Sequence, residues 1–157
     1  MHPDWLIIDG YNLLHQVNEI AGLLRSDIQL ARHRLVRKIE KTAHRMASKT
    51  TIVFDGREAG LDVALTSNHM EIYFSPAGLS ADTIIERLVS RYNHPENMLV
   101  VTSDRAEANA VLSDGAQVMS IQDFLDQCCI DERKTVSLQT PHPREQPKLG
   151  DIFPDGL

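Results

Sequence analysis

The sequence has little cysteine, few aromatic residues and no long apolar run, and each shortage excludes a class of protein. Cys128 and Cys129 are its two cysteines; adjacent cysteines rarely pair, and their spacing does not suit a zinc site, so a disulfide scaffold and a zinc module are excluded. We expect both to be packing residues near a helix end. No apolar stretch approaches the roughly 18 residues of a membrane span, and no basic segment precedes the first apolar run as in a signal peptide. We therefore expect a cytoplasmic protein that makes no membrane contact.

The chain also has no excess of positive charge. It contains 16 Lys and Arg and 22 Asp and Glu, so its formal net charge is −6. This balance argues against a polybasic nucleic-acid binder. The charges are nevertheless segregated along the chain. Residues 25–49 hold eight basic and two acidic residues, so this segment carries +6 and the remainder of the chain −12. The sequence therefore predicts a basic helix on an acidic body.

Short apolar runs alternate with helical patterns over most of the chain. The runs that we expect to form buried strands are residues 5–8, 51–54, 72–74, 98–102 and, more weakly, 116–119. Apolar positions at helical spacing cover residues 27–48, 81–92, 104–112 and 121–129. Ser80 is a suitable N-cap for the second of these helices, and Gly115 lies where the third should end. This alternation predicts an α/β fold with a mostly parallel sheet of about five strands, flanked by helices.

The pattern stops at about residue 131. Four of the seven prolines lie in the last 17 residues, and no apolar periodicity accompanies them. We therefore predict one domain over residues 1–130 and a proline-rich tail over 131–157, flexible or draped over the body.

Acidic residues follow three of the expected strands. Asp9, Asp55 and Asp104 each come directly after or close to a strand end, where side chains converge on one crevice of a parallel sheet. Asp82 adds an acid in the first turn of a helix, and Glu86 lies on the same face one turn later. Each of these residues alone would serve as an ordinary turn or N-cap residue. Together they predict a site for a divalent cation, Mg²⁺ or Mn²⁺, because like charges repel and hard oxygen ligands suit these ions.

Other chemistries lack their motifs. The sequence contains no Gly-x-x-x-x-Gly-Lys-Ser/Thr phosphate loop, no Gly-x-Gly-x-x-Gly after a strand and no Gly-x-Ser-x-Gly nucleophile elbow. The seven histidines are dispersed without ligand spacing. A nucleotide kinase, a dinucleotide enzyme and a serine hydrolase are therefore disfavoured.

Four segments in register resemble one known family. They are Ile7–His15 (IIDGYNLLH), Ile52–Gly56 (IVFDG), Ser80–Arg87 (SADTIIER) and Val100–Arg105 (VVTSDR). The first resembles the opening motif of NYN domains, the branch of PIN-like nucleases typified by bacterial YacP-type proteins. The likeness spans about residues 4–130, and the tail lies outside it.

This resemblance implies a PIN-like three-layer α/β sandwich and a metal-dependent ribonuclease that hydrolyses RNA phosphodiester bonds, which we expect to be endonucleolytic. Carried over by position, the metal-binding carboxylates would be Asp9, Asp82 and Asp104. Asn12 would orient the metal-bound groups or the phosphate. Asp55, Glu86 and Ser103 match family motifs as second-tier site residues. Glu107, one helical turn after Asp104, is available as a further acid, and we assign it no role.

The basic segment suggests where RNA would lie. On a helical wheel one side collects basic residues that could follow a phosphate backbone, namely Arg34, Arg37, Lys38, Lys41 and Arg45. The alternative is a solvated helix face. Aromatic residues make up 5% of the chain, so few side chains are available for RNA bases to stack on. Sequence specificity would therefore come from a partner such as a ribosome or another RNA–protein complex.

Two other functions remain open at this point. A non-catalytic RNA- or ribosome-binding module could keep the same fold, and it would differ from the nuclease in showing no metal-dependent cleavage. A small-molecule phosphohydrolase would differ in accepting nucleotide monoesters. The retained acids favour the nuclease.

Overall fold

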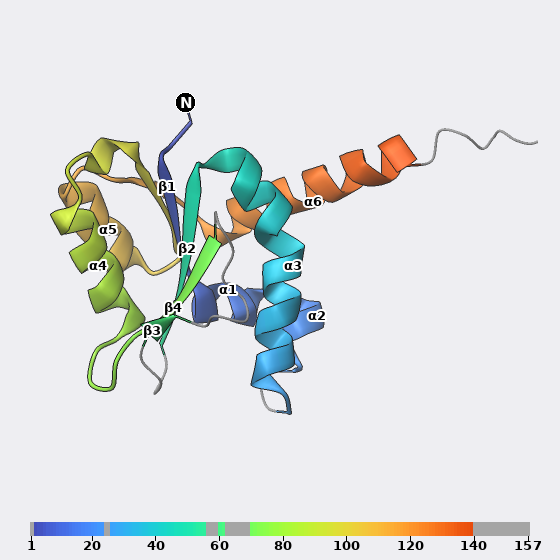
Figure 1. Ribbon diagram of the computed structural model, residues 1–157, viewed down its shortest axis with the longest axis horizontal. Helices are drawn as coiled ribbons and strands as arrows, with labels where there is room; N and C mark the ends of the chain where they lie inside the picture. The colour runs from blue at the N-terminus through green and yellow to red at the C-terminus, as the bar shows by residue number, and fades with distance from the viewer. Residues whose placement is uncertain (1, 24–25, 56–59, 62–69, 140–157) are drawn as a thin grey trace, which may run out of the picture.

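The computed structural model has a central sheet between two layers of helices (Figure 1). It describes residues 2–23, 26–55, 60–61 and 70–139. The strands are β1 (Trp5–Asp9), β2 (Lys49–Phe54), β3 (Gly60–Leu61), β4 (Met70–Phe74), β5 (Met98–Val101) and β6 (Gln117–Met119). The helices are α1 (Gly10–Gln16), α2 (Asn18–Ala21), α3 (Ile28–Met46), α4 (Ala81–Arg91), α5 (Arg105–Ser113) and α6 (Ile121–Gln139), with a 3-10 turn at Pro95–Asn97.

The sheet has the order β3-β4-β2-β1-β5-β6. All its neighbouring strands are parallel except β3, a two-residue edge strand that pairs antiparallel with β4. The chain moves outward from β1 to β2 and β4, and then returns to the other side of β1 to build β5 and β6. The strand order therefore reverses beside β1, and such a reversal opens a crevice at the carboxyl ends of the strands. The predicted α/β fold with a mostly parallel sheet is confirmed.

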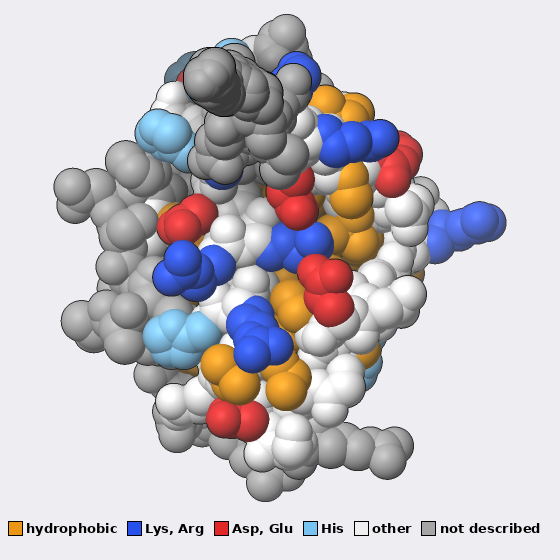
Figure 2. Space-filling view, turned by 90° about the vertical axis from the view of Figure 1, so that its right-hand side faces the viewer, with side chains coloured by type: hydrophobic (Ala, Val, Ile, Leu, Met, Phe, Trp, Pro, Cys, Tyr) orange, Lys and Arg blue, Asp and Glu red, His pale blue; other side chains and the backbone are white. Residues whose placement is uncertain are grey.

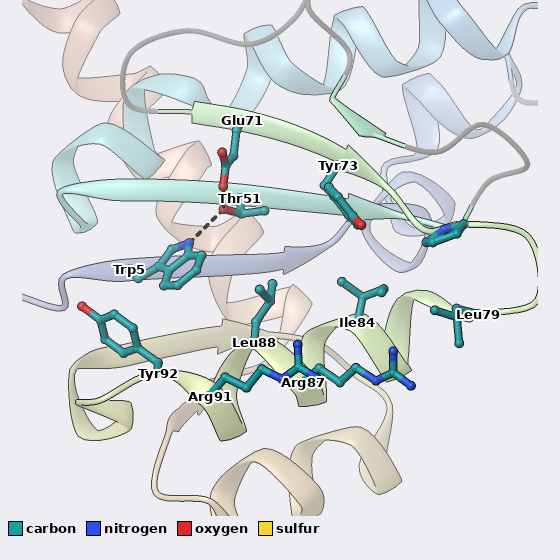
Figure 3. A pocket seen from close by; sticks show the side chains of 11 residues that line it. Trp5, Thr51, Glu71, Tyr73, Leu79, Ile84, Arg87, Leu88, Arg91 and Tyr92 are labelled. Carbon is teal, nitrogen blue, oxygen red and sulfur yellow. Dashed lines mark hydrogen bonds between the residues drawn. The ribbon is translucent and has the colours of Figure 1, made fainter.

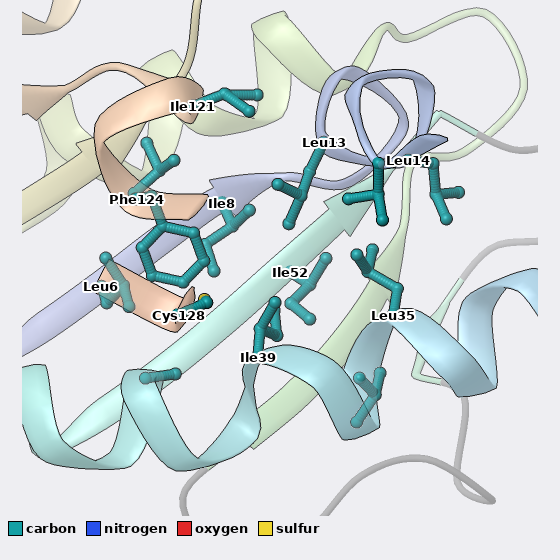
Figure 4. Close-up of a cluster of buried hydrophobic side chains, with 14 of the residues drawn as sticks. Leu6, Ile8, Leu13, Leu14, Leu35, Ile39, Ile52, Ile121, Phe124 and Cys128 are labelled. Atoms are coloured by element: carbon teal, nitrogen blue, oxygen red, sulfur yellow. The ribbon is translucent and has the colours of Figure 1, made fainter. Parts of the chain in front are cut away.

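The two faces of the sheet are covered by different helices because successive side chains of a strand point to opposite faces. Leu6 and Ile8 of β1 join a buried cluster with residues of α1, α3 and α6, part of which Figure 4 shows. Ile7 joins a second cluster with residues of α4 and α5. Asp9 has the same parity as Ile7, so the strand directs it toward the α4–α5 side.

The predicted helix signals are confirmed at several ends. Ser80 caps α4, and its Oγ accepts a hydrogen bond from the backbone N–H of Thr83 at 3.2 Å. Gly115 follows α5 with φ +102°, a left-handed backbone conformation that glycine adopts without strain. The helix predicted over residues 27–48 is α3, which begins after the N-cap Asp27.

The last helix is longer than its sequence predicts. The helical pattern ends at Cys129, yet α6 continues to Gln139, so the boundary predicted at residue 130 falls inside a helix. Contacts with α3 explain the extension, because Asp131 is 5% exposed and its Oδ2 accepts hydrogen bonds from Thr42 Oγ1 at 2.7 Å and Arg45 Nε at 3.1 Å. Residues 140–157 of the predicted tail lie outside the described residues.

The cysteine prediction is half right. Cys128 is buried against the α3 side of the core, whereas Cys129 is exposed, so the expectation that both are packing residues was wrong for Cys129. Within the part of the chain that the structure describes, no helix is both long enough and apolar enough to span a membrane.

Candidate metal site of an acidic crevice

Asp9 lies at the carboxyl end of β1, where the strand order reverses, and it is the N-cap of α1. The backbone N–H of Asn12 donates a hydrogen bond to Asp9 Oδ1 at 3.3 Å. Gly10 follows directly, and a Cβ at this position would lie 2.5 Å from two ring carbons of Phe54. A glycine is therefore needed for α1 to start this close to β2. The short turn keeps the Asp9 carboxylate against the sheet, where it is 7% exposed.

Three carboxyl groups from three elements meet at this edge of the sheet. Asp9 comes from β1, Asp82 from the first turn of α4 and Glu107 from the first turn of α5. Each offers one oxygen, and these oxygens all lie within 4.8 Å of one another. We call these three residues the acidic triad.

Glu107 is the most deeply buried member, at 1% exposure. Its Oε1 accepts a hydrogen bond from the Thr102 hydroxyl at 3.0 Å, which fixes the carboxyl group at the end of β5. Its Oε2 is buried as well, and no described group forms a hydrogen bond with it. Buried polar atoms normally have a partner, so this oxygen needs either a proton shared with a neighbouring carboxyl of the triad or a cation.

The pKa values show the cost of gathering these acids. Burial above all, together with the negative charges of Asp82 and Asp104, raises the pKa of Asp9 to about 6 against the lowering effect of the hydrogen bond from Asn12. Burial, followed by the neighbouring carboxyls of Asp82 and Asp9, raises the pKa of Glu107 to about 9. Without a cation nearby, the site therefore holds protons near neutral pH.

The donor set fits a hard divalent cation. It consists of carboxylate oxygens, with no histidine or cysteine in the triad, which is the ligand chemistry of Mg²⁺ or Mn²⁺ rather than of Zn²⁺. A cation would also give the buried Oε2 of Glu107 a partner and remove the repulsion that raises both pKa values. The triad therefore satisfies the chemical requirements of a divalent-cation site.

Asp104 lies beside the triad and is the N-cap of α5. Its Oδ1 accepts hydrogen bonds from the backbone N–H groups of Ala106, at 2.9 Å, and Glu107, at 3.1 Å, so it caps α5. Its charge reaches Asp9, whose pKa it raises. The position that the sequence assigned to Asp104 among three close carboxylates is filled by Glu107. We keep Asp104 as a candidate ligand at the border of the site.

Asn12 is one helical turn beyond Asp9 in α1. Its backbone holds Asp9, and its side-chain Oδ1 accepts a hydrogen bond from Gln16 Nε2 at 3.2 Å. Ser103 is exposed after β5, and its Oγ accepts a hydrogen bond from the backbone N–H of Ile121 at the start of α6. Both residues therefore tie helix ends to the edge of the sheet where the triad lies.

The two second-tier acids lie outside the acidic triad. Asp55 follows β2, one strand away from the reversal of strand order, and its Oδ1 is 3.5 Å from the hydroxyl of Ser75. Glu86 is half-buried in α4, one turn beyond Asp82 and so farther from the carboxyl edge of the sheet.

The basic side of α3 is partly neutralised inside the molecule. Lys38 Nζ lies 3.1 Å from carboxylate oxygens of both Glu19 and Glu132, and these contacts raise its pKa against the effect of burial. Arg45 Nε lies 3.1 Å from Asp131. On this side of the molecule, Figure 2 shows Lys and Arg interleaved with Asp and Glu.

Arg34 and Arg37 differ from these residues. Both are exposed, and no described acidic side chain forms an ion pair with either. Arg34 lies in the first half of α3 and Arg37 at its midpoint. Because α3 runs antiparallel to the strands, both lie nearer the carboxyl edge of the sheet than Lys41 and Arg45 do. All five are on the face opposite α4 and α5. Arg25, part of the basic segment, lies outside the described residues.

Glu107 is the residue that the sequence alone could not place. It stands three positions after Asp104, a spacing that is also typical of a helix N-terminus in which the acid turns back to the backbone. The structure instead has the hydroxyl of Thr102 accepting the N–H of Asp104, at 3.1 Å, which leaves Glu107 to turn inward. The sequence contained one signal. Thr102 lies two residues after the buried Val100, so its side chain points to the same face of the sheet, toward α4 and α5.

Comparison with known proteins gives a consistent result. The sequence model of the YacP-like NYN domain family matches residues 6–152. The Bacillus subtilis (strain 168) protein described as uncharacterized protein YacP is 28% identical over 133 residues, which cover 83% of this chain and 78% of that protein. The crystal structure of Rae1 (YacP) from Bacillus subtilis matches with a TM-score of 0.72 at 27% identity, covering 87% of this chain and 82% of that one. Its W164L mutant matches with a TM-score of 0.70 at 26% identity, covering 85% and 80%.

Proposed function

The chain belongs to the YacP-like NYN domain family, and from that premise we propose that it is a divalent-metal-dependent ribonuclease. The observation that carries the proposal is the acidic triad, in which oxygens of Asp9, Asp82 and Glu107 lie within 4.8 Å of one another at the reversal of strand order. An acidic crevice of this kind suits hydrolysis of a phosphodiester bond. The cleavage would be endonucleolytic, in the cytoplasm.

In this proposal Asp9, Asp82 and Glu107 hold Mg²⁺ or Mn²⁺, and Asp104 borders the same ion. A bound cation of this class supplies Lewis acidity toward water and toward phosphate oxygens. The chain itself positions the carboxylates: the backbone N–H of Asn12 holds Asp9, and the hydroxyl of Thr102 holds Glu107. The Asn12 side chain, on the first turn of α1, is our candidate for orienting the phosphate.

The proposed partner is RNA, either free or presented by a ribosome or another RNA–protein complex. Arg34 and Arg37 are our first candidates on α3 for contact with its backbone, since both are exposed and lack an acidic partner among the described residues. Lys38, Lys41 and Arg45 would have a smaller part, because Lys38 and Arg45 already bind acids of α2 and α6.

The test is cleavage of linear and circular single-stranded and structured RNAs with Mn²⁺, with Mg²⁺ and with EDTA. We expect cleavage with either metal, none in EDTA, and linear products from the circles. Asp9→Asn and Glu107→Gln should abolish it, and Asn at residue 9 should still cap α1 and keep the chain folded. The matched control is Glu40→Gln, an exposed residue of α3.

Full activity in excess EDTA, or in both folded variants, would overturn the proposal. RNA binding without cleavage under every metal condition would favour the non-catalytic RNA-binding module. Hydrolysis of nucleotide monoesters alone would favour the small-molecule phosphohydrolase.

A further inference from the structure

A hollow lies on the same face of the sheet as the acidic triad. It has a volume of about 650 Å³ and lies between α4 and the strands β1, β2 and β4 (Figure 3). Trp5 and Tyr92 lie at one end, and Leu79, just before α4, lies at the other. We call it the aromatic groove. The triad does not use it.

The groove concentrates the aromatic residues that have a polar end. The chain contains one tryptophan and three tyrosines, and Trp5, Tyr73 and Tyr92 all line this groove. The rings of Trp5 and Tyr92 meet edge to face, with centroids 5.4 Å apart and an interplanar angle of 77°. All three are half-buried, so each packs against the core and still presents part of its ring. A low overall aromatic content therefore does not mean a lack of stacking surface.

The indole of Trp5 is held in place. Its Nε1 donates a hydrogen bond to Thr51 Oγ1 at 2.8 Å, and that hydroxyl donates to Glu71 Oε1 at 2.9 Å. Lys49 Nζ lies 3.3 Å from the same oxygen and 4.3 Å from the centre of the Trp5 ring. Lys49 thus neutralises the charge of Glu71, the one acid that lines the groove. Because the Trp5 ring is already held in place, it loses little conformational freedom when a ligand stacks on it.

The rim of the groove is positive. Arg87 and Arg91 lie four residues apart on the groove side of α4, and both are exposed. Among the described residues, no acidic side chain forms an ion pair with either of them. Unpaired guanidinium groups beside half-buried aromatic rings are complementary to a polyanion that carries flat bases, and they match an apolar peptide poorly.

We propose that the aromatic groove binds a single-stranded segment of the RNA substrate, with bases against Trp5, Tyr73 and Tyr92 and phosphates at Arg87 and Arg91. This assignment rests on the proposed function. Helix α4 joins the two sites, since it carries Asp82 in its first turn and both arginines on its later turns. The groove also lies on the triad's face of the sheet, whereas the basic side of α3 lies on the opposite face.

Trp5 provides a direct measurement, because it is the chain's single tryptophan. Hexamers of uridylate and adenylate are titrated into the full chain in EDTA, so that cleavage plays no part, and tryptophan fluorescence is followed. We expect saturable quenching. The Arg87→Gln/Arg91→Gln variant should bind about tenfold more weakly or worse and lower the salt slope by about 1.4, the value for two phosphates of a single strand. Tyr92→Ala should weaken binding at least about fivefold.

The matched control is Arg133→Gln, an exposed arginine of α6, which should bind as the parent chain does. Unchanged fluorescence on saturation with RNA, or unchanged affinity in the double arginine variant, would overturn the groove assignment. Quenching by a mononucleotide with an affinity equal to that of the hexamers would also overturn it, since a strand would then add nothing. These outcomes are independent of the nuclease test, because binding is measured without metal and cleavage with it.

Discussion

The hydroxyl of Thr102 donates a hydrogen bond to Glu107 Oε1 at 3.0 Å, and it links the end of β5 to the buried carboxyl of the acidic triad. The same hydroxyl accepts the backbone N–H of Asp104 at 3.1 Å. One side chain therefore fixes the loop that starts α5 and directs a carboxyl group into the crevice. Groups that orient metal ligands in this way commonly matter almost as much as the ligands themselves.

Replacing this hydroxyl tests its role. Thr102→Val keeps the shape of the side chain but leaves Glu107 Oε1 without its donor. We expect the affinity for Mn²⁺ to fall about 10- to 100-fold. Isothermal titration with Mn²⁺ measures the change, and the control is Thr50→Val, at a buried threonine of β2. Equal affinities in the two variants would show that the hydrogen bond does not position a ligand.

The raised pKa values predict how stability varies with pH. In the metal-free chain, folding raises the pKa of Asp9 from 3.8 to about 6 and that of Glu107 from 4.5 to about 9. The folded state thus binds these protons more tightly than the unfolded state, so their stabilising effect is complete at low pH. It is lost as pH rises through about 6 for Asp9 and about 9 for Glu107.

Thermal unfolding between pH 5 and pH 9, with EDTA and with Mn²⁺, measures this effect. We expect the Tm in EDTA to fall toward high pH and the gain in Tm from Mn²⁺ to grow over the same range, because the cation binds the ionised carboxylates. Glu107→Gln should flatten both dependences. A gain from Mn²⁺ that shrinks as pH rises would contradict the assignment of the triad as the metal site.

The basic residues of α3 should divide into two groups. Arg34→Gln/Arg37→Gln should leave the Tm unchanged and, if RNA contacts this side, lower the salt slope of RNA binding by about 1.4. Lys38→Gln should instead lower the Tm, because it leaves Glu19 and Glu132 without their cation. Thermal unfolding and salt-dependent binding on the same preparations separate the two effects. If the double arginine variant binds RNA with an unchanged slope, this side of α3 is a solvated face.

The buried contact of Asp131, in the middle of α6, gives a prediction about stability alone. Burial favours the neutral form of Asp131, but hydrogen bonds from Thr42 and Arg45 hold the pKa of its carboxyl below the usual value. Asp131→Asn should therefore cost about 1–3 kcal/mol of unfolding free energy near neutral pH, measured by urea denaturation. Because a lowered pKa stabilises fully above the unfolded value of 3.8, the difference from the parent should shrink as pH falls below 3.8 and vanish once pH is below the lowered pKa of the folded state. A constant difference at all pH values would show that the loss comes from packing.

The parts of the fold that depend on local sequence could be predicted. Buried parallel strands are apolar on both faces, so Leu6 to Ile8 and Leu99 to Val101 are recognisable as runs. The cap at Ser80 and the stop at Gly115 depend on one residue each. The convergence of Asp9 and Asp82 follows from the topology of any open parallel sheet, so the approach of these two side chains could be predicted from the strand pattern.

The rest depends on tertiary contacts that periodicity does not contain. Asp131, in the middle of α6, is held by Thr42 and Arg45 of α3, about 90 residues away in sequence, so the local pattern after residue 130 could not reveal this contact. The same contact between α6 and α3 neutralises part of the basic side of α3, which a helical wheel shows as continuous. Glu107 enters the triad because its side chain turns inward, and sequence spacing does not distinguish this from an ordinary capping acid.

Helix α4 fixes a length. Nine residues separate Asp82 from Arg91, which corresponds to about 13 Å along the axis of a regular helix. The backbone positions of Asp82 and Arg91 cannot change this spacing while the helix stays intact, and the reach of the Arg91 side chain is the one remaining freedom. If RNA occupies both places, the offset between the held nucleotides and the cut bond is constant for every substrate, and fragments of a defined minimum length would stay bound after cleavage.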